Sequence, residues 1–142
     1  ESGAMIRPAR MIDIYCLVEV LEDTHRRSIL AGATKVDPAY AKKLLGNFIM
    51  KNGGSHEGGT LVMVATDKAG EIQAFVAGAL QRVYHICDKL QADDVFLVAT
   101  DAAAPRDVVR LFGEYVGWAA GNPKVYKICA SHTDSVTYRK VI

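Results

Sequence analysis

The chain has 142 residues, enough for a single domain with a proper hydrophobic core. Half of the residues are hydrophobic and 23% are charged, a balance typical of a globular protein and not of a disordered chain. The net charge of +1, from 17 basic and 16 acidic residues, argues against a dominant basic surface for nucleic acid or an anionic membrane.

The chain start and the cysteines bear on where the protein works. Residues 1–4, before Met5, resemble the remnant of an expression tag, so we treat residues 5–142 as one native domain. No signal peptide is visible, and apolar runs such as 61–65 are too short to cross a bilayer. Cys16, Cys87 and Cys129 lie among apolar neighbours and form no Cys-x-x-Cys pair. This placement predicts buried thiols in a reducing cytoplasm.

The first third of the chain predicts one strand and two helices. Residues 5–7 are an expected strand that Pro8 ends. Apolar residues at positions 14, 17, 18 and 21 recur at helical spacing, with acidic residues opposite, which predicts an amphipathic helix. Asp37 before Pro38 is a strong start for a second helix that reaches position 49. The glycine-rich residues 51–60 are expected to form a mobile loop.

The rest of the chain predicts strands separated by a helix. Residues 61–66 and 71–84 are expected to form a hairpin around the turn 67–70, and residues 95–100 a further strand. An apolar stripe predicts a helix over 106–120, which Gly121, Asn122 and Pro123 end. A strand over 125–130 and a helix over 131–142 follow. This order predicts an α/β (α+β) fold, with a mixed, mostly antiparallel twisted sheet flanked by helices.

The turn 101–106 is a candidate phosphate site because it leads into a helix. The donors would be the main-chain N–H groups of Arg106, Asp107, Val108 and Val109, helped by the charges of Arg106 and Arg110. Against this, alanines at 102–104 stand where a close cradle uses glycine, residue 105 is a proline without a donor, and Asp107 repels an anion. On local chemistry alone, a plain strand–helix connection is favoured.

Other candidate residues carry weaker signals. Tyr138, on the expected last helix, could donate a proton to a leaving group, although most tyrosines are packed aromatics. Asp93, Asp94 and Asp101 flank one strand and could supply a general base, although solvated carboxylates are common there. A zinc site built from histidines 85 and 132 with cysteines 87 and 129 matches no standard spacing, so we predict no metal. The glycine-rich loop also lacks the Lys-Ser/Thr of a nucleotide P-loop.

Taken in order, these segments resemble the GNAT superfamily of N-acetyltransferases. The opening IRPA and DI at 6–9 and 13–14 resemble its first strand and first helix. LVMVAT, KAGE and IQAFVAG at 61–78 resemble its second and third strands with their turn, and VFLVAT at 95–100 its fourth strand. VRLF at 109–112 with WA at 118–119 resembles the cofactor-side helix, and SVTYRK at 135–140 a late helix. The likeness covers nearly all of residues 5–142.

The resemblance implies that acetyl-CoA binds in a splay between the fourth and fifth strands. The backbone of Phe96, Leu97 and Val98 would pair with the pantetheine arm, and the diphosphate would lie on the start of the helix at 106–109. Tyr138 would protonate the departing thiolate, and a carboxylate, for which Asp94 is the candidate, or water would accept the amine proton.

The chain departs from the family pattern in two places. The family's Arg/Gln-x-x-Gly-x-Gly/Ala loop would fall on residues 103–108, which read AAPRDV and contain no glycine. The chain also stops at Ile142, where the family's Gly-Phe pair and last two strands should follow. We therefore expect the C-terminal strands to be missing and the sheet edge after Ala130 to be unpaired, which predicts a homodimer.

Two functions stay open at this point. The first is an acetyl-CoA-dependent N-acetyltransferase of the bacterial or phage cytoplasm, acting on a primary amine of a small molecule or a protein. The second is a catalytically inactive GNAT-like protein that binds a partner or serves a structural role, for example in a phage particle. A sensor of another nucleotide-like ligand is a third and weaker reading. No motif selects the acceptor.

Overall fold

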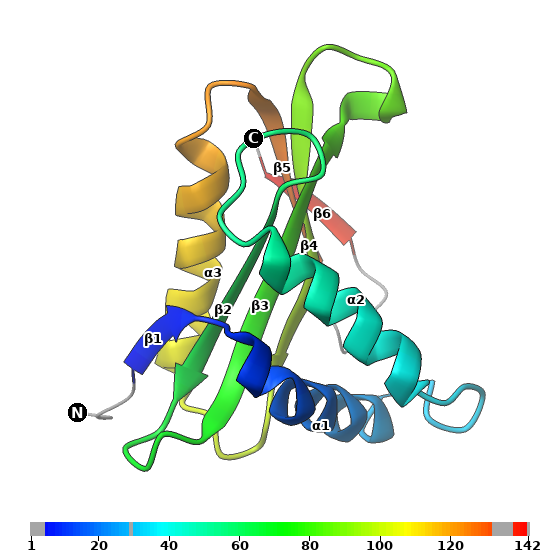
Figure 1. Cartoon of the computed structure of the whole chain (residues 1–142), viewed down its shortest axis with the longest axis vertical. Helices are drawn as coiled ribbons and strands as arrows, with labels where there is room; N and C mark the ends of the chain where they lie inside the picture. Colours follow the sequence, from blue (N-terminus) through cyan, green and yellow to red (C-terminus); the bar gives the residue numbers. More distant parts are fainter. Residues whose placement is uncertain (1–4, 29, 132–137, 142) are drawn as a thin grey trace.

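The computed structural model describes residues 5–28, 30–131 and 138–141, with the backbone alone from residue 131 onward. Six strands form one sheet in chain order, with helices on both faces (Figure 1). Neighbouring strands are antiparallel except β4 and β5, which are parallel. The elements are β1 (Met5–Pro8), the short helix η1 (Met11–Asp13), α1 (Ile14–Arg26), α2 (Pro38–Met50), β2 (Thr60–Thr66), β3 (Ile72–Arg82), η2 (Val83–His85), β4 (Leu90–Ala99), α3 (Pro105–Ala120), β5 (Val125–Ser131) and β6 (Tyr138–Val141).

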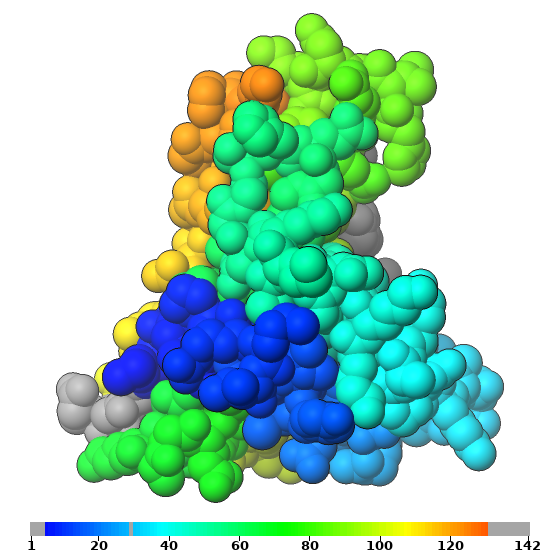
Figure 2. Space-filling model, viewed as in Figure 1, coloured from blue at the N-terminus to red at the C-terminus, as the bar shows by residue number. Residues whose placement is uncertain are grey.

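Alternate residues of the central strands supply two separate cores. In β2, Leu61 and Ala65 pack in the core that α3 covers, whereas Val62 and Val64 pack in the core under α1 and α2. Successive side chains of a strand point to opposite faces, so a continuously apolar strand is buried on both sides. Figure 2 shows one face of the molecule, on which the side chains of α1 and α2 cover the sheet. The result is a three-layer arrangement of helix, sheet and helix.

The sequence prediction of the first two helices is confirmed. α1 buries Leu17, Val18 and Val20, and so presents the predicted apolar stripe to the sheet. α2 begins at Pro38, and the Asp37 carboxylate accepts a hydrogen bond from the Tyr40 N–H at 3.1 Å. This bond satisfies one of the main-chain donors that a helix leaves unpaired at its start.

The glycine-rich loop after α2 is held at several points, contrary to the mobile loop that the sequence predicted. Trp118 Nε1–H donates to the Gly54 carbonyl at 3.2 Å, and the Asn122 amide donates to the Ser55 carbonyl at 2.8 Å. The main-chain N–H of Gly58 donates to the Leu80 carbonyl at 3.0 Å. The loop is therefore docked on the end of α3 and on β3, through partners far away in the sequence.

The predicted helix over 131–142 is wrong for the part of that range that the structure describes. Tyr138–Val141 forms β6, which pairs antiparallel with Ile128–Ser131 of β5. The edge of β5 after Ala130, expected to be unpaired, is thus covered by a strand of the same chain. One of the C-terminal strands expected to be missing is therefore present. The strand expected at 95–100 also begins earlier, at Leu90.

The cysteines differ in exposure, so the prediction of three buried thiols was right for one of them. Cys129 is buried in β5, Cys87 is half-buried after η2, and Cys16 is exposed on α1. In α1 the buried residues are Leu17, Val18 and Val20, the neighbours of Cys16. Among the described residues, no helix is long and apolar enough to cross a membrane.

Candidate functional site

The most distinctive feature of the sheet is the point at which β4 and β5 separate. These strands pair in parallel from Leu90 and Val125 to Ala92 and Ile128, and the pairing ends there. Beyond this point β5 pairs with β6, while β4 continues along β3 as far as Ala99. Among the described residues, no strand pairs with this edge of β4 over its C-terminal half, which leaves the opening that the resemblance predicted between the fourth and fifth strands.

The register of β4 decides which main-chain groups face this opening. The Thr100 N–H donates to the Gln73 carbonyl at 2.8 Å, so these residues form a hydrogen-bonded pair with β3. Hydrogen-bonded and non-hydrogen-bonded pairs alternate along an antiparallel ladder. The main-chain groups of Phe96 and Val98 therefore also face β3, whereas those of Leu97 face the open edge. Of the three residues that the resemblance assigns to a pantetheine arm, Leu97 has its main chain directed toward the gap.

A β-bulge lies close to the point of separation. Gly78 of β3 pairs with Asp94 of β4, and the preceding residue, Ala77, pairs with Phe96, so Val95 is the extra residue. Asp94 is buried. It lies on the side of the sheet that α3 covers, because it follows Ala92 of that core at a spacing of two. The predicted general base is thus enclosed beneath α3 beside a bulge, a feature found often near active sites.

The start of α3 leaves fewer free donors than the sequence suggested. The N–H groups of Asp107 and Val108 both donate to the Ala104 carbonyl, at 3.0 and 3.4 Å. Ala104, the residue before the helix, makes no side-chain cap. The N–H of Arg106 is therefore the donor that the helix geometry leaves for a ligand or water. Arg106 as a whole is exposed.

Three other residues predicted at this helix end are used differently. The buried carboxylate of Asp107 forms an ion pair with the Arg110 guanidinium at 3.4 Å, so the charge of Arg110 is partly neutralised within the protein. Val109 is exposed on the outer side of the helix. Of the predicted phosphate contacts, those of Arg106 are the ones that the local geometry favours.

Arg27, to which the sequence assigned no role, lies at the far end of the open edge. Its guanidinium donates to the Ala99 carbonyl at 2.8 Å and to the Asp23 carboxylate at 2.8 Å, and it lies 3.3 Å from the carboxylate of Asp101. Ala99 is two residues beyond Leu97, so its carbonyl also faces away from β3. Arg27 thus connects α1 to the end of β4 and to the turn before α3.

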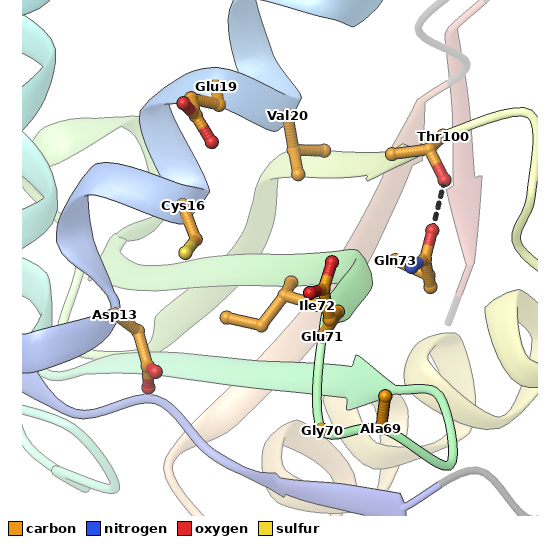
Figure 3. A pocket seen from close by; sticks show the side chains of 10 residues that line it. All are labelled: Asp13, Cys16, Glu19, Val20, Ala69, Gly70, Glu71, Ile72, Gln73 and Thr100. Carbon is orange, nitrogen blue, oxygen red and sulfur yellow. Dashed lines mark hydrogen bonds between the residues drawn. The ribbon is translucent and has the colours of Figure 1, made fainter.

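A cavity of about 660 Å³ lies between α1 and the turn that joins β2 to β3 (Figure 3). Its wall includes Cys16 and Glu19 of α1, Glu71 at the hairpin, and Gln73 beside Thr100. The Thr100 hydroxyl donates to the Gln73 side-chain carbonyl at 2.7 Å. The carboxylates of Glu19 and Glu71 disfavour a diphosphate in this cavity, so we do not place a nucleotide cofactor there.

Asp13, also in the wall of this cavity, is engaged in an ion pair. Its carboxylate accepts two hydrogen bonds from the Arg7 guanidinium, at 2.8 and 3.1 Å, and one from the Arg10 N–H at 2.8 Å. The bonds from Arg7 are the main reason that the pKa of Asp13 lies below its ordinary value, and the same pair raises the pKa of Arg7. This carboxylate is therefore a structural anion of the β1–α1 junction and not a general base.

The structure describes only part of the remaining predicted site residues. Tyr138 is the first residue of β6, and its backbone pairs with Ser131. The role assigned to its side chain lies outside the described residues, as does His132 of the zinc alternative. Within the described part of the chain, no three His, Cys, Asp or Glu residues are grouped so that they could hold a metal ion.

No family model matches the sequence, and no curated protein sequence matches it. Solved structures do match the fold. The PaiA N-acetyltransferase from Thermoplasma acidophilum, solved with coenzyme A, superposes with a TM-score of 0.63 at 16% identity, over 94% of this chain and 82% of that one. The ribosomal-protein-alanine N-acetyltransferase from Brucella melitensis gives 0.66 at 19% identity, over 89% and 72%.

A GCN5-related N-acetyltransferase from Kribbella flavida gives a TM-score of 0.62 at 17% identity, over 90% of this chain and 71% of that one. At these identities the likeness concerns the fold alone. The protein therefore has the GNAT fold that the order of its sequence segments suggested.

Proposed function

We propose that this protein is an acyl-CoA-dependent N-acyltransferase that acts on a primary amine. The observation that carries the proposal is the separation of β4 from β5 after Ala92 and Ile128, which leaves the edge of β4 open on its way to α3. An extended pantetheine arm can pair with such an edge as an added strand does. Several solved structures with this fold are N-acetyltransferases, one of them a complex with coenzyme A.

Residues around the opening would bind different parts of the cofactor. The main chain of Leu97 would pair with an amide of the arm, and Arg106 would meet the diphosphate with its N–H and its guanidinium. Acyl-CoA supplies the thioester that the amine attacks. Because the amine and the thioester are held together at one site, proximity and orientation would supply most of the rate acceleration.

The protons in this reaction would move through two side chains. When the amine nitrogen bonds to the acyl carbon and the carbon–sulfur bond breaks, Tyr138 would donate its phenolic proton to the departing thiolate. Asp94, or a water molecule, would accept the proton that the amine loses. Acetyl is the acyl group that we expect, and the acceptor amine belongs to a small molecule or a protein.

Titration with coenzyme A and acetyl-CoA tests the proposed cofactor directly. Calorimetry should give a measurable affinity, and ligand at about 100 times its dissociation constant should add roughly 2.7 kcal/mol to the free energy of unfolding. If millimolar ligand gives neither binding heat nor a thermal shift, the proposed cofactor is wrong.

Arg106→Ala tests the placement of the diphosphate. Loss of one charge-assisted contact should raise the dissociation constant of coenzyme A by about tenfold. Lys43→Ala is the matched control, since it removes an exposed charge from α2, which packs on β2. Equal affinities for the two variants would mean that the phosphates lie elsewhere.

A second function is favoured by the chemistry at the start of α3. Two of the four predicted donors bond to Ala104, and a buried carboxylate at position 107 disfavours an anion. These features suit a GNAT-like protein that has lost its cofactor and binds a partner or serves a structural role, as in a phage particle. Acetylation of an amine by the wild type separates the two readings, because the second predicts none. In an active preparation, Tyr138→Phe then tests the proton donor, since turnover should fall while coenzyme A affinity stays. Unchanged turnover would exclude Tyr138 from the mechanism.

A further inference from the structure

Tyr115 of α3 is completely buried, with aromatic contacts to rings of its own helix and a polar contact to the sheet. Its hydroxyl donates to the main-chain carbonyl of Cys129 at 2.5 Å. Its ring lies between those of Phe112 and Trp118, with centroids 5.8 and 6.3 Å away. A buried tyrosine keeps its hydroxyl only where a partner compensates for the loss of water.

The ring reaches the sheet over a glycine. A Cβ atom added to Gly78 of β3 would lie 2.8 Å from two ring carbons of Tyr115, and 3.1 Å from the ring of Trp118. Carbon atoms do not approach so closely, so any larger residue at this position would displace the ring. Gly78 is also the residue that pairs with Asp94, next to the bulge of β4.

These contacts bridge three neighbouring strands at the point where two of them part. Gly78 belongs to β3 and Cys129 to β5, with β4 between them. Cys129 directly follows Ile128, the last residue of β5 that pairs with β4. The hydroxyl of Tyr115 therefore enters the sheet one residue beyond the end of the parallel ladder.

We propose that Tyr115 is a positioning residue that sets the separation of β4 and β5, and so the width of the opening. Its ring fills the space that Gly78 leaves, and its hydroxyl holds the carbonyl of Cys129 where further pairing with β4 would otherwise continue. This inference rests on the proposed function in one respect: the opening is taken to hold the arm of coenzyme A. Tyr115 itself touches neither cofactor nor acceptor.

Tyr115→Phe tests the proposal because it removes the hydroxyl and keeps the ring. We expect the dissociation constant of coenzyme A to rise by about tenfold, the effect of one hydrogen bond. Amide hydrogen exchange over residues 93–99 and 125–131 should also become faster than in the wild type. Val64→Ala is the control, since it weakens the opposite core, under α1 and α2, and leaves these contacts intact.

Each outcome decides the proposal. The proposal is supported if Tyr115→Phe binds coenzyme A more weakly and exchanges amides in these segments faster than Val64→Ala does, at matched melting temperatures. Equal affinity and equal exchange in the two variants overturn it. If the wild type binds no coenzyme A, the proposed function fails, and the exchange rates of the two segments alone decide the role of Tyr115. If Tyr115→Phe does not fold, Gly78→Ala replaces it, since it displaces the ring and should show the same local increase in exchange; an unchanged rate overturns the proposal.

Discussion

Arg7 and Asp13 form the best-defined ion pair at the junction of β1 and α1. The carboxylate is nearly buried, with 8% of its side chain exposed, and two of its hydrogen bonds come from one guanidinium. Bidentate pairs of this kind are among the stronger polar contacts of proteins. The pair fixes the direction in which the chain turns from the sheet edge into the first helix.

Asp13→Asn should lower the free energy of unfolding by about 2 kcal/mol at pH 7. The pKa of Asp13 is depressed in the folded state, so its ionised form contributes stability above the unfolded pKa of about 3.9. This contribution is lost as the pH falls through the folded value. Urea unfolding at pH 7 and at pH 2–3 should therefore show a difference between wild type and variant that shrinks in acid.

Asp88→Asn is the control for this measurement, because Asp88 is exposed after η2. It should leave stability nearly unchanged at both pH values. A difference between wild type and Asp13→Asn that stays constant with pH would contradict the role of the ionised pair.

Gly78→Ala should destabilise the fold by about 1–3 kcal/mol, the usual cost of overpacking a core. Tyr115→Leu makes room for the new methyl group, so the double variant should lose less stability than the two single variants together, by a coupling energy of about 1 kcal/mol. Denaturant unfolding of the two single variants and the double variant measures this coupling energy. Gly113→Ala, at a helical site with no neighbour within 4 Å of the added carbon, should be neutral or stabilising.

At the scale of elements, the end of β4 is connected to α1 by Arg27. The ion pair with Asp23 lies within one helix end, whereas the bond to Ala99 joins segments 72 positions apart. In the turn from β4 to α3, Ala103 packs against the core, but Asp101 is exposed and the helix start has no side-chain cap. A side chain from another element therefore holds this turn in place.

Arg27→Ala should cost about 1 kcal/mol of stability, because the guanidinium is 40% exposed and solvent weakens its ion pairs. Its larger effect should be local, with faster amide exchange over residues 99–104. Arg26→Ala provides the comparison, since Arg26 pairs with the same Asp23 at 3.6 Å but is 69% exposed. Equal exchange at 99–104 in the two variants would show that Arg27 does not hold the turn.

At the scale of the whole molecule, the sheet differs from the expected one at its C-terminal end. We predicted a homodimer because the edge of β5 was expected to be open, and β6 covers that edge. The reason for expecting a homodimer is thus removed, and dimerisation would need another surface.

Light scattering at micromolar concentration should accordingly give a monomer mass of about 15 kDa, since the composition corresponds to 15.4 kDa. A mass twice as large, independent of dilution, would show that another surface joins two copies. Coenzyme A should leave the mass unchanged if the opening belongs to one chain.

The sequence alone determined most of the elements and their order. Helical periodicity, the Asp37-Pro38 start and the hairpin turn at 67–70 are encoded within a few residues, and the structure places elements there. The single parallel crossover through α3 also followed from this order, because two parallel strands need a long connection between them. The resemblance of these segments to the GNAT superfamily was confirmed at the level of the fold.

The tertiary structure alone decided the details of the candidate site. The end of the β4–β5 ladder, the direction of the Leu97 main chain and the engagement of Asp107 and Val108 depend on register and helix geometry, which no local pattern specifies. The contacts of Arg27 and Tyr115 join segments far apart in the chain, so the sequence around either residue carries no sign of them. Strand β6 replaced an expected helix because pairing with β5 outweighs weak local propensity.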